Sequence, residues 1–335
     1  MINWDRGMTS ETYITLVDPV TWHDTERIEI TGGSISRTNE GLRNAADIEF
    51  VNYDQSSERW IRVWMDCRQE GGSDHVALFT GLASSPDRNI KGTLVTNKVT
   101  CNSVLQPADD ILLPRGWFVP AKANAATVIR DLLTVSPAPV EVGTGAPNLL
   151  ESIVAEDNET RLSMVTKILE AIGWRMQICG DGTIVIGEEA SEISVMFDPI
   201  ENDCIETELT VEYDWYSAPN VFRAVTDTDA VTIRDEDPDS RLSTVTRGRE
   251  IWMEETDCKL NDGESLQGYA ERRLKEEQTV VYKVKYKRRF HPDILVSDRV
   301  GLHYPAQDIQ GTFIVESQSI ELGLGATTSE EVTAI

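Results

Sequence analysis

Four histidines are the side chains best suited to metal binding or acid–base catalysis at neutral pH: His23, His75, His291 and His303. No HExxH motif occurs, and no histidine has a second ligand four residues away. His291 precedes a proline in an expected turn, and His303 falls in an expected strand. The sequence also lacks a GxSxG nucleophile motif and a phosphate-binding GxxxxGK[ST] loop. These patterns indicate a protein that is not an enzyme and needs no cofactor.

The cysteines and one acidic stretch could suggest bound metal. Widely separated, odd in number and without a CxxC motif, the cysteines favour buried free thiols: Cys67, Cys101, Cys179, Cys204 and Cys258. The acidic stretch Asp227–Ser240 could suggest calcium. An EF-hand needs glycine at the sixth loop position and glutamate at the twelfth, which here are Thr232 and Pro238. We expect a solvated loop and no metal. A carboxylate pair for glycoside hydrolysis stays open, because acids occur throughout the chain.

The sequence YKVKYKRRF at Tyr282–Phe290 concentrates positive charge. Read as a strand, it places apolar side chains on one face, with Arg288 as the exception. The apolar face carries Tyr282, Val284, Tyr286 and Phe290. The opposite, basic face carries Lys283, Lys285, Lys287 and Arg289. This row of cations could bind either phosphates or carboxylates.

The charge of the whole chain favours carboxylates. Its 57 acidic and 31 basic residues give a formal net charge of −26, which opposes a polyanion within about 8 Å, the screening length at physiological salt. A second expected strand offers complementary charge through Glu206, Glu208, Glu212 and Asp214. Opposite charges across neighbouring strands contribute about 0.2–1 kcal/mol per pair. We therefore predict that the basic face meets carboxylates, within one domain or across a subunit boundary, and binds no nucleic acid specifically.

The first third of the chain is predicted to be β. Short runs rich in branched and aromatic residues are separated by breakers such as Gly32-Gly33 and Ser85-Pro86. The expected strands are Thr12–Val17, Arg27–Thr31, Ala46–Val51, Arg59–Met65, Val76–Leu82 and Thr93–Cys101. Many short strands at this spacing indicate an antiparallel sandwich or barrel.

The pattern changes near Pro120. Asn124 can cap one amphipathic helix, and a second, with apolar residues from Leu162 to Ile172, ends at Gly173. A hairpin follows from Trp174 to Gly187 through a Gly-Asp-Gly turn. These elements predict a small α/β domain over residues 121–200.

From Ile205 the chain returns to β, interrupted by one helix from Ser265 to about Gln278. The strands expected to form this second sheet are Ile205–Asp214, Val221–Val225, Val231–Ile233, Thr244–Met253, Val280–Phe290, Arg299–Tyr304 and Thr312–Ser317 with a last run through Leu322. The predicted fold class is mainly β with an α+β insert. It has two antiparallel β-barrel domains, residues 1–120 and 201–335, flanking the α/β domain.

The ordered set of motifs resembles phage tail hub proteins, the baseplate hub or tail-tip proteins of contractile and siphophage tails. The closing segment, residues 268–322, is similar to their helix, long strand and final hairpin, with Ser297 where the family has glycine. Leu78–Arg88 is similar to a strand of their first tube-like barrel, and Ala218–Glu250 to the start of the second. The helices and hairpin between resemble their α/β insert.

The resemblance implies a structural role in a virion tail baseplate or tip. Such a chain would form a homotrimeric ring joining the hexameric tail tube, or a distal tail protein, to the central spike or tail-tip protein. The tape measure protein would be a further partner, and DNA would at most pass through the bore. Alternatives are a tail-associated cell-wall hydrolase and a carbohydrate-binding β-sandwich that uses Trp60 and Trp64. Without a membrane span or secretory signal, the chain is expected to be made in the host cytoplasm.

Overall fold

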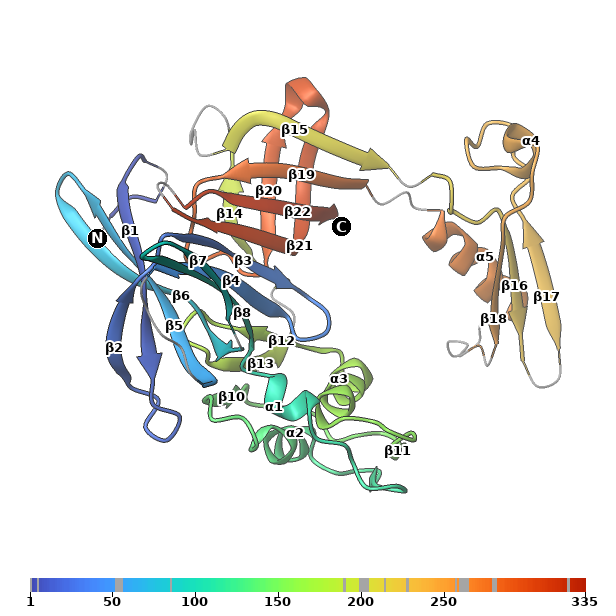
Figure 1. The fold of residues 1–335 in the computed structure, drawn as a ribbon. Helices are drawn as coiled ribbons and strands as arrows, with labels where there is room; N and C mark the ends of the chain where they lie inside the picture. The colour runs from blue at the N-terminus through green and yellow to red at the C-terminus, as the bar shows by residue number, and fades with distance from the viewer. Residues whose placement is uncertain are drawn as a thin grey trace. The chain divides into compact units, whose positions relative to one another are not determined.

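The chain divides into two compact units in the computed structural model (Figure 1). Unit 1 comprises Met1–Leu209 and Lys285–Thr333 with Ile335, and unit 2 comprises Thr210–Val284 with Ala334. The structure describes residues 2–4, 6–51, 57–84, 86–188, 191–198, 205–213, 215–226, 229–256, 258, 265–278, 282–323 and 326–335. The division into domains at residues 120 and 200 stays a prediction.

Eight strands form the N-terminal β part of unit 1 (Figure 1). They are β1 (Thr9–Val17), β2 (Asp24–Glu29), β3 (Gly32–Thr38), β4 (Asn44–Val51), β5 (Arg59–Gln69), β6 (Gly72–Ala83), β7 (Asp87–Lys91) and β8 (Leu94–Ser103). Alternation of side chains explains why they bury one face. In β4, Ala46, Ile48 and Phe50 are buried, whereas Glu49 is exposed.

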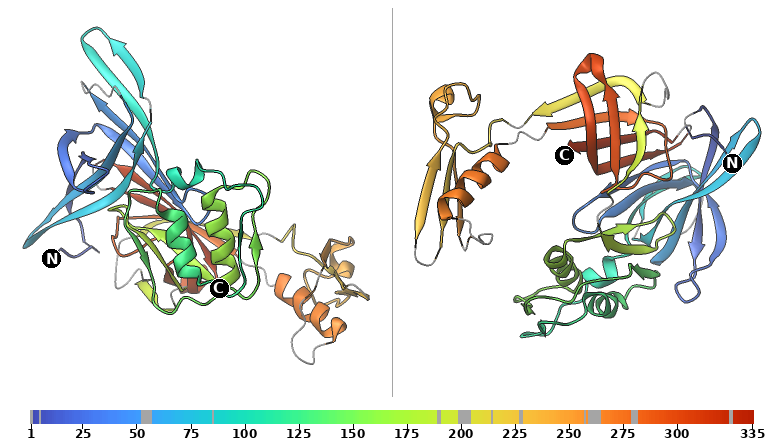
Figure 2. Two further views of the ribbon diagram at one scale, coloured as in Figure 1. Left: turned by 90° about the horizontal axis from the view of Figure 1, so that it is seen from below. Right: turned by 180° about the vertical axis from the view of Figure 1, so that it is seen from behind.

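The insert, residues 104–188, has helices that pack on each other and on a small sheet (Figure 2). Its elements are α1 (Gln106–Asp109), β9 (Phe118–Val119), α2 (Ala125–Leu133), β10 (Val140–Val142), β11 (Ile153–Val154), α3 (Arg161–Ile172), β12 (Trp174–Ile178) and β13 (Ile184–Glu188). The Asn124 side chain caps α2 by accepting a hydrogen bond from Thr127 N at 3.1 Å. Gly173, with φ of 67°, ends α3 in the left-handed conformation. Both helix signals are confirmed, as is the hairpin from Trp174.

The C-terminal β part contains the remaining strands of the large sheet. They are β14 (Ile193–Phe197), β15 (Ile205–Tyr213), β19 (Tyr282–Arg288), β20 (Arg299–Tyr304), β21 (Ile309–Leu322) and β22 (Thr328–Ala334), with the 3₁₀ turn η1 (Pro305–Gln307) before β21. Strand β15 carries the chain out of unit 1 and β19 brings it back.

Strand β21 joins the two β parts into one sheet. Its first half pairs antiparallel with β20, and its second half pairs antiparallel with β3. The resulting 14-stranded sheet has the order β15-β19-β22-β21-β3-β4-β8-β6-β5-β1-β2, with β20, β14 and β7 attached at its sides.

The mainly β class is thereby confirmed, but two separate closed barrels are not. Over the described residues the sheet order is open, with β15 and β2 at its ends. The reason is the length of β21. At 14 residues it reaches both partner strands, and it therefore uses its hydrogen bonds to join the β parts. Phe290, Ile320 and Leu322 accordingly pack into the core of the N-terminal strands.

Unit 2 is a small sheet covered on one face by a helix (Figure 2). Its elements are β16 (Val221–Val225), β17 (Ala230–Arg234), α4 (Thr244–Arg247), β18 (Trp252–Thr256) and α5 (Leu266–Glu277), with strand order β17-β16-β18. Tyr269, Ala270 and Leu274 of α5 bury Phe222 and Ala224.

Two predictions for this segment were wrong. These strands do not continue the large sheet, because their apolar face is buried locally by α5. Residues 244–247 are helical and not part of a strand, with the Ser243 side chain accepting from Thr246 N at the helix start and Gly248 at its end.

Candidate functional site

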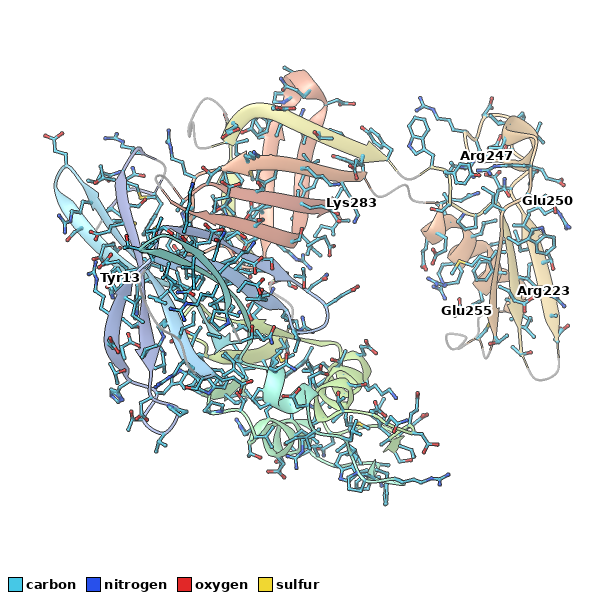
Figure 3. The ribbon with its side chains drawn as sticks, in the orientation of Figure 1. Tyr13, Arg223, Arg247, Glu250, Glu255 and Lys283 are labelled. Atoms are coloured by element: carbon cyan, nitrogen blue, oxygen red, sulfur yellow. The ribbon has the colours of Figure 1, made fainter. Side chains whose placement is uncertain are left out.

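Strand β19 carries the predicted basic face, and its side chains alternate as expected. Lys283, which is labelled in Figure 3, and Lys287 are exposed and Lys285 is half-buried, whereas Val284 and Tyr286 are buried. Arg289, just beyond the strand, is half-buried. The alternation places the cations on the solvent side of the sheet.

The acidic strand β15 is the neighbour of β19 in the sheet order. Its Glu206, Glu208 and Glu212 side chains are exposed, and Asp214 lies outside the described residues. One ion pair on the basic face joins Lys285 Nζ to Glu331 Oε2 of β22 at 3.4 Å. Neither Glu206 nor Glu208 forms an ion pair with a described residue. Pairing of the two predicted sets therefore stays a prediction.

Behind the basic face lies a buried ion pair that the sequence patterns did not predict. Arg288 Nε donates to Glu330 Oε2 at 2.8 Å, and Arg288 Nη2 donates to Glu330 Oε1. The side chains are 1% and 0% exposed. The signal in the sequence was Arg288 itself, the cation on the otherwise apolar face of β19.

The buried pair belongs to a wider polar network. Gln318 of β21 donates to Glu330 Oε1 at 2.6 Å and to the Ile294 carbonyl at 2.9 Å. The side-chain amide oxygen of Gln318, Oε1, accepts from Arg37 Nη1 at 3.2 Å. Because Arg37 is on β3 and Gln318 on β21, the network crosses the seam between the N- and C-terminal β parts.

Burial and neighbouring charge shift the pKa values in this network. Burial, with the nearby charge of Arg288, lowers the pKa of Arg37 to about 10, so this guanidinium stays charged at neutral pH. Burial alone would raise the pKa of Glu330. The charge of Arg288 and the hydrogen bonds from Arg288 and Gln318 outweigh burial, and its pKa falls below the ordinary value. A buried and hydrogen-bonded network of this kind can fix strand register.

The Gly-Asp-Gly turn of the insert is fastened to the N-terminal β part. Thr80 Oγ1 donates to the Gly180 carbonyl at 2.8 Å, and Arg62 Nη2 donates to the Asp181 carbonyl at 3.1 Å. A Cβ atom at Gly180 would lie 1.8 Å from the Ala77 carbonyl oxygen, so only glycine allows this approach.

The insert is also fastened to the turn before β20. Gln177 Nε2 donates to the Val296 carbonyl at 2.7 Å and to Asp298 Oδ1 at 2.9 Å, and Arg175 donates to the Ser297 carbonyl. Ser297 has φ of 70°, in the left-handed region that favours glycine. This is the position at which the resembled family has glycine. Hydrogen bonds thus connect the insert to both β parts.

His75, Trp64 and Trp60, which were considered for catalysis or sugar binding, all contact neighbouring side chains. His75 Nδ1 lies 2.5 Å from Asp66 Oδ1, and the His75 ring stacks on Trp64 at 4.0 Å. Trp64 Nε1 donates to Asp24, and Trp60 packs beside Trp22 at 5.7 Å, so both tryptophans proposed for sugar binding have partners.

The described part of the chain holds no cluster of three or more His, Cys, Asp or Glu suited to a metal. Cys204 and the start of the acidic stretch, Asp227, lie outside it.

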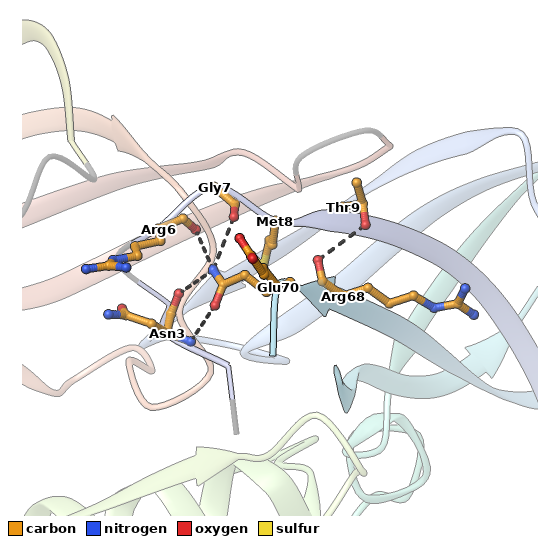
Figure 4. Close-up of a pocket in the computed structure, with 8 residues that line it drawn as sticks. Asn3, Arg6, Gly7, Met8, Thr9, Arg68 and Glu70 are labelled. Carbon is orange, nitrogen blue, oxygen red and sulfur yellow. Dashed lines mark hydrogen bonds between the residues drawn. The ribbon is translucent and has the colours of Figure 1, made fainter. Parts of the chain in front are cut away.

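A hollow of about 1010 Å³ lies where the N-terminal segment meets the end of β5 (Figure 4). The Gln69 amide fills its hydrogen-bonding capacity with backbone, accepting from Asn3 N and donating to the carbonyls of Asn3 and Gly7. Arg6 and Arg68 point away from one another. The hollow therefore lacks the convergent polar groups of a ligand site.

Among the described residues no helix is long and apolar enough to cross a membrane.

No protein-family model matches this sequence, and no curated protein matches it. Solved structures match nearly the whole chain. The tail protein from Neisseria meningitidis MC58 superposes with a TM-score of 0.68 at 15% identity, covering 96% of each chain. The 43 kDa tail protein of prophage MuSo2 from Shewanella oneidensis gives 0.65 at 13% identity, covering 96% of this chain and 97% of that one.

Prophage tail protein gp18 from Listeria monocytogenes EGD-e gives a TM-score of 0.54 at 12% identity, covering 96% of this chain and 94% of that one. At such low identities these likenesses establish the fold. The resemblance to phage tail proteins predicted from the sequence is confirmed at that level.

Proposed function

We propose that this chain is the structural hub of a phage tail or phage-tail-like particle. Three copies would form a ring that joins the hexameric tail tube to the central spike or tail tip. The observation that carries this proposal is the match of fold over nearly the full length of two tail proteins, each of which is itself covered almost completely.

The internal architecture of unit 1 supports a ring of this kind. Each copy contributes an N-terminal and a C-terminal β part, held in one sheet by β21 and by the buried network around Arg288. Three copies would therefore present six β parts to a sixfold tube. The buried polar contacts at the seam suit a component that must keep one fixed shape under load.

The partners follow from this position. They would be a tail tube or distal tail protein on one side, a spike or tail-tip protein on the other, and the tape measure protein in the bore. The strongly acidic surface suits a channel along which DNA passes without binding. The chain would reside in the virion, at the baseplate or tail tip, and be made in the host cytoplasm. We propose no catalytic role.

Reconstitution with the tail tube protein tests the proposal. Native mass spectrometry and negative-stain microscopy of the mixture are expected to show three copies of this chain capping the tube. An obligate interface between copies should bury about 2,000 Å² or more per pair. A one-, two- or fourfold arrangement on the tube would contradict the proposed function, as would robust cell-wall hydrolysis abolished by one carboxylate substitution.

A further inference from the structure

Two adjacent aromatic side chains protrude from unit 2. Trp215 and Tyr216, in the segment between β15 and β16, are 51% and 78% exposed. Trp, Tyr and Arg are enriched at the centres of protein interfaces, and contiguous exposed apolar side chains mark interaction sites. The pair therefore needs an explanation beyond the folding of unit 2.

Two arginines, Arg247 and Arg249, bond to the backbone of this pair; Arg247 is labelled in Figure 3. Arg247 donates to the Trp215 carbonyl and, at 2.8 Å, to the Ala218 carbonyl. Arg249 Nη2 donates to the Tyr216 carbonyl at 2.8 Å, and its guanidinium lies 4.2 Å from the centre of the Tyr216 ring. A segment ordered before binding loses less conformational entropy when a partner arrives. We call Trp215, Tyr216, Arg247 and Arg249 the aromatic–arginine patch.

The charge of the patch indicates what it can bind. Its guanidinium groups bond to backbone carbonyls, and no carboxylate among the described residues pairs with Arg247 or Arg249. Two cations without a counter-charge on a protein of net charge −26 favour an acidic protein surface. A nucleic acid would also bring its phosphates against the acidic residues outside the patch, whereas a protein surface can confine its carboxylates to the contact itself.

The same chain carries a matching acidic surface. Glu206 and Glu208 alternate along β15 and therefore share a face, both are exposed, and neither has an ion-pair partner in the described part of the chain. Strand β15 also ends the order of the large sheet. In a head-to-tail ring, one surface of each copy binds a different, complementary surface of the next copy. This chain carries two such surfaces.

We propose that the aromatic–arginine patch of one copy docks on the Glu206–Glu208 face of a second copy. This inference rests on the proposed function, because it names the contact that would close the ring. Arg247 and Arg249 face the two carboxylates, while Trp215 and Tyr216 supply the apolar area around them.

Sedimentation equilibrium of the full chain, under the conditions in which the ring forms, tests this contact. Replacing both Trp215 and Tyr216 with Ala should raise the dissociation constant about tenfold or more, as loss of an interface anchor does. Arg249→Glu and Glu208→Arg should each weaken the ring, and the two together should restore it. Phe118→Ala, which removes an exposed aromatic of the insert, is the matched control and should change nothing.

The rescue separates a lost contact from a misfolded chain, since a folding defect in Arg249→Glu would persist in the double variant. Normal rings from the Trp215/Tyr216 variant, or absence of rescue, would overturn the inference and leave the proposed function intact. A wild-type chain that stays monomeric, alone and with the tube protein, would reject both.

Discussion

Unit 1 and unit 2 each contain an Arg–Glu pair that joins neighbouring strands, in opposite surroundings. In unit 1, Arg288 of β19 and Glu330 of β22 are 1% and 0% exposed. In unit 2, Arg223 of β16 and Glu254 of β18 lie 3.2 Å apart and are 47% and 51% exposed. The residue types are the same, but water screens one pair and is excluded from the other.

The contrast between the two pairs shows where a charged pair can specify a structure. A one-residue slip of β19 or β22 would leave a buried guanidinium or carboxylate without its partner, at a large cost in free energy. Separating Arg223 from Glu254 in the same way would leave two groups that water already solvates, so this pair adds little to the cost of a slip. The buried pair can therefore fix the register of strands in the large sheet, whereas the exposed pair contributes little to either register or stability.

Removing one half of the buried pair should destabilise the chain more than any other change considered. Glu330→Ala leaves Arg288 buried without a counter-charge and should lower the free energy of unfolding by about 3–5 kcal/mol, measured by urea denaturation. Replacing both partners with apolar residues, Arg288→Met with Glu330→Leu, is the control and should recover much of the loss. If Glu330→Ala is as stable as the wild type, the pair is not the constraint we describe.

Acid should weaken the buried pair in a defined direction. The pKa of Glu330 in the folded chain lies below its ordinary value of 4.5, so the unfolded chain binds the proton more readily. The stabilisation is present in full above about pH 4.5 and is lost as the pH falls through the lower, folded-state pKa. The Glu330→Gln variant has an amide at this position and therefore no carboxyl group that titrates. The stability advantage of the wild type over this variant should shrink below pH 4.5, and an advantage that stays constant down to pH 2 would contradict the assignment.

Local signals in the sequence predicted local structure well. The cap at Asn124, the helix end at Gly173 and the hairpin after it depend on residues close together in the chain, and all three are present. The alternation of β19 was also visible, and it marked Arg288 as an exception.

Contacts distant in sequence escaped prediction. The position of Arg288 did not predict that Glu330, 42 residues later, would be its partner. Alternation along a strand shows which face a residue occupies, but it does not identify the residue that packs against that face. Gly32 and Gly33 were interpreted as breakers, yet they begin β3. A Cβ at Gly33 would lie 2.2 Å from the Asp47 carbonyl oxygen, so the glycine serves a close strand approach. The separate sheet of unit 2 was missed for the same reason, since strand propensity does not identify a partner strand.

The close contact between Gly180 and the Ala77 carbonyl involves no charge, and breaking it should have an intermediate effect on stability. Gly180→Ala would place a methyl group against the Ala77 carbonyl and force the turn away from β6. We expect a loss of about 1–3 kcal/mol in the free energy of unfolding, the usual cost of overpacking. Gly187→Ala, in the same hairpin but with open space beside it, is the matched control. Equal stability of the two variants would show that the turn is not held tightly against β6.

The smallest effect is expected at the exposed pair of unit 2. Arg223→Ala and Glu254→Ala should each change the free energy of unfolding by less than about 1 kcal/mol, and a double-mutant cycle should give a coupling of about 0.2–1 kcal/mol. Because these side chains are about half exposed, salt screens their attraction, and the coupling should fall as salt is raised. Arg288 and Glu330 should keep their coupling under the same salt, since water and ions do not reach them. A coupling at Arg223–Glu254 as large and as salt-resistant as that of the buried pair would mean that another surface covers this sheet face in solution.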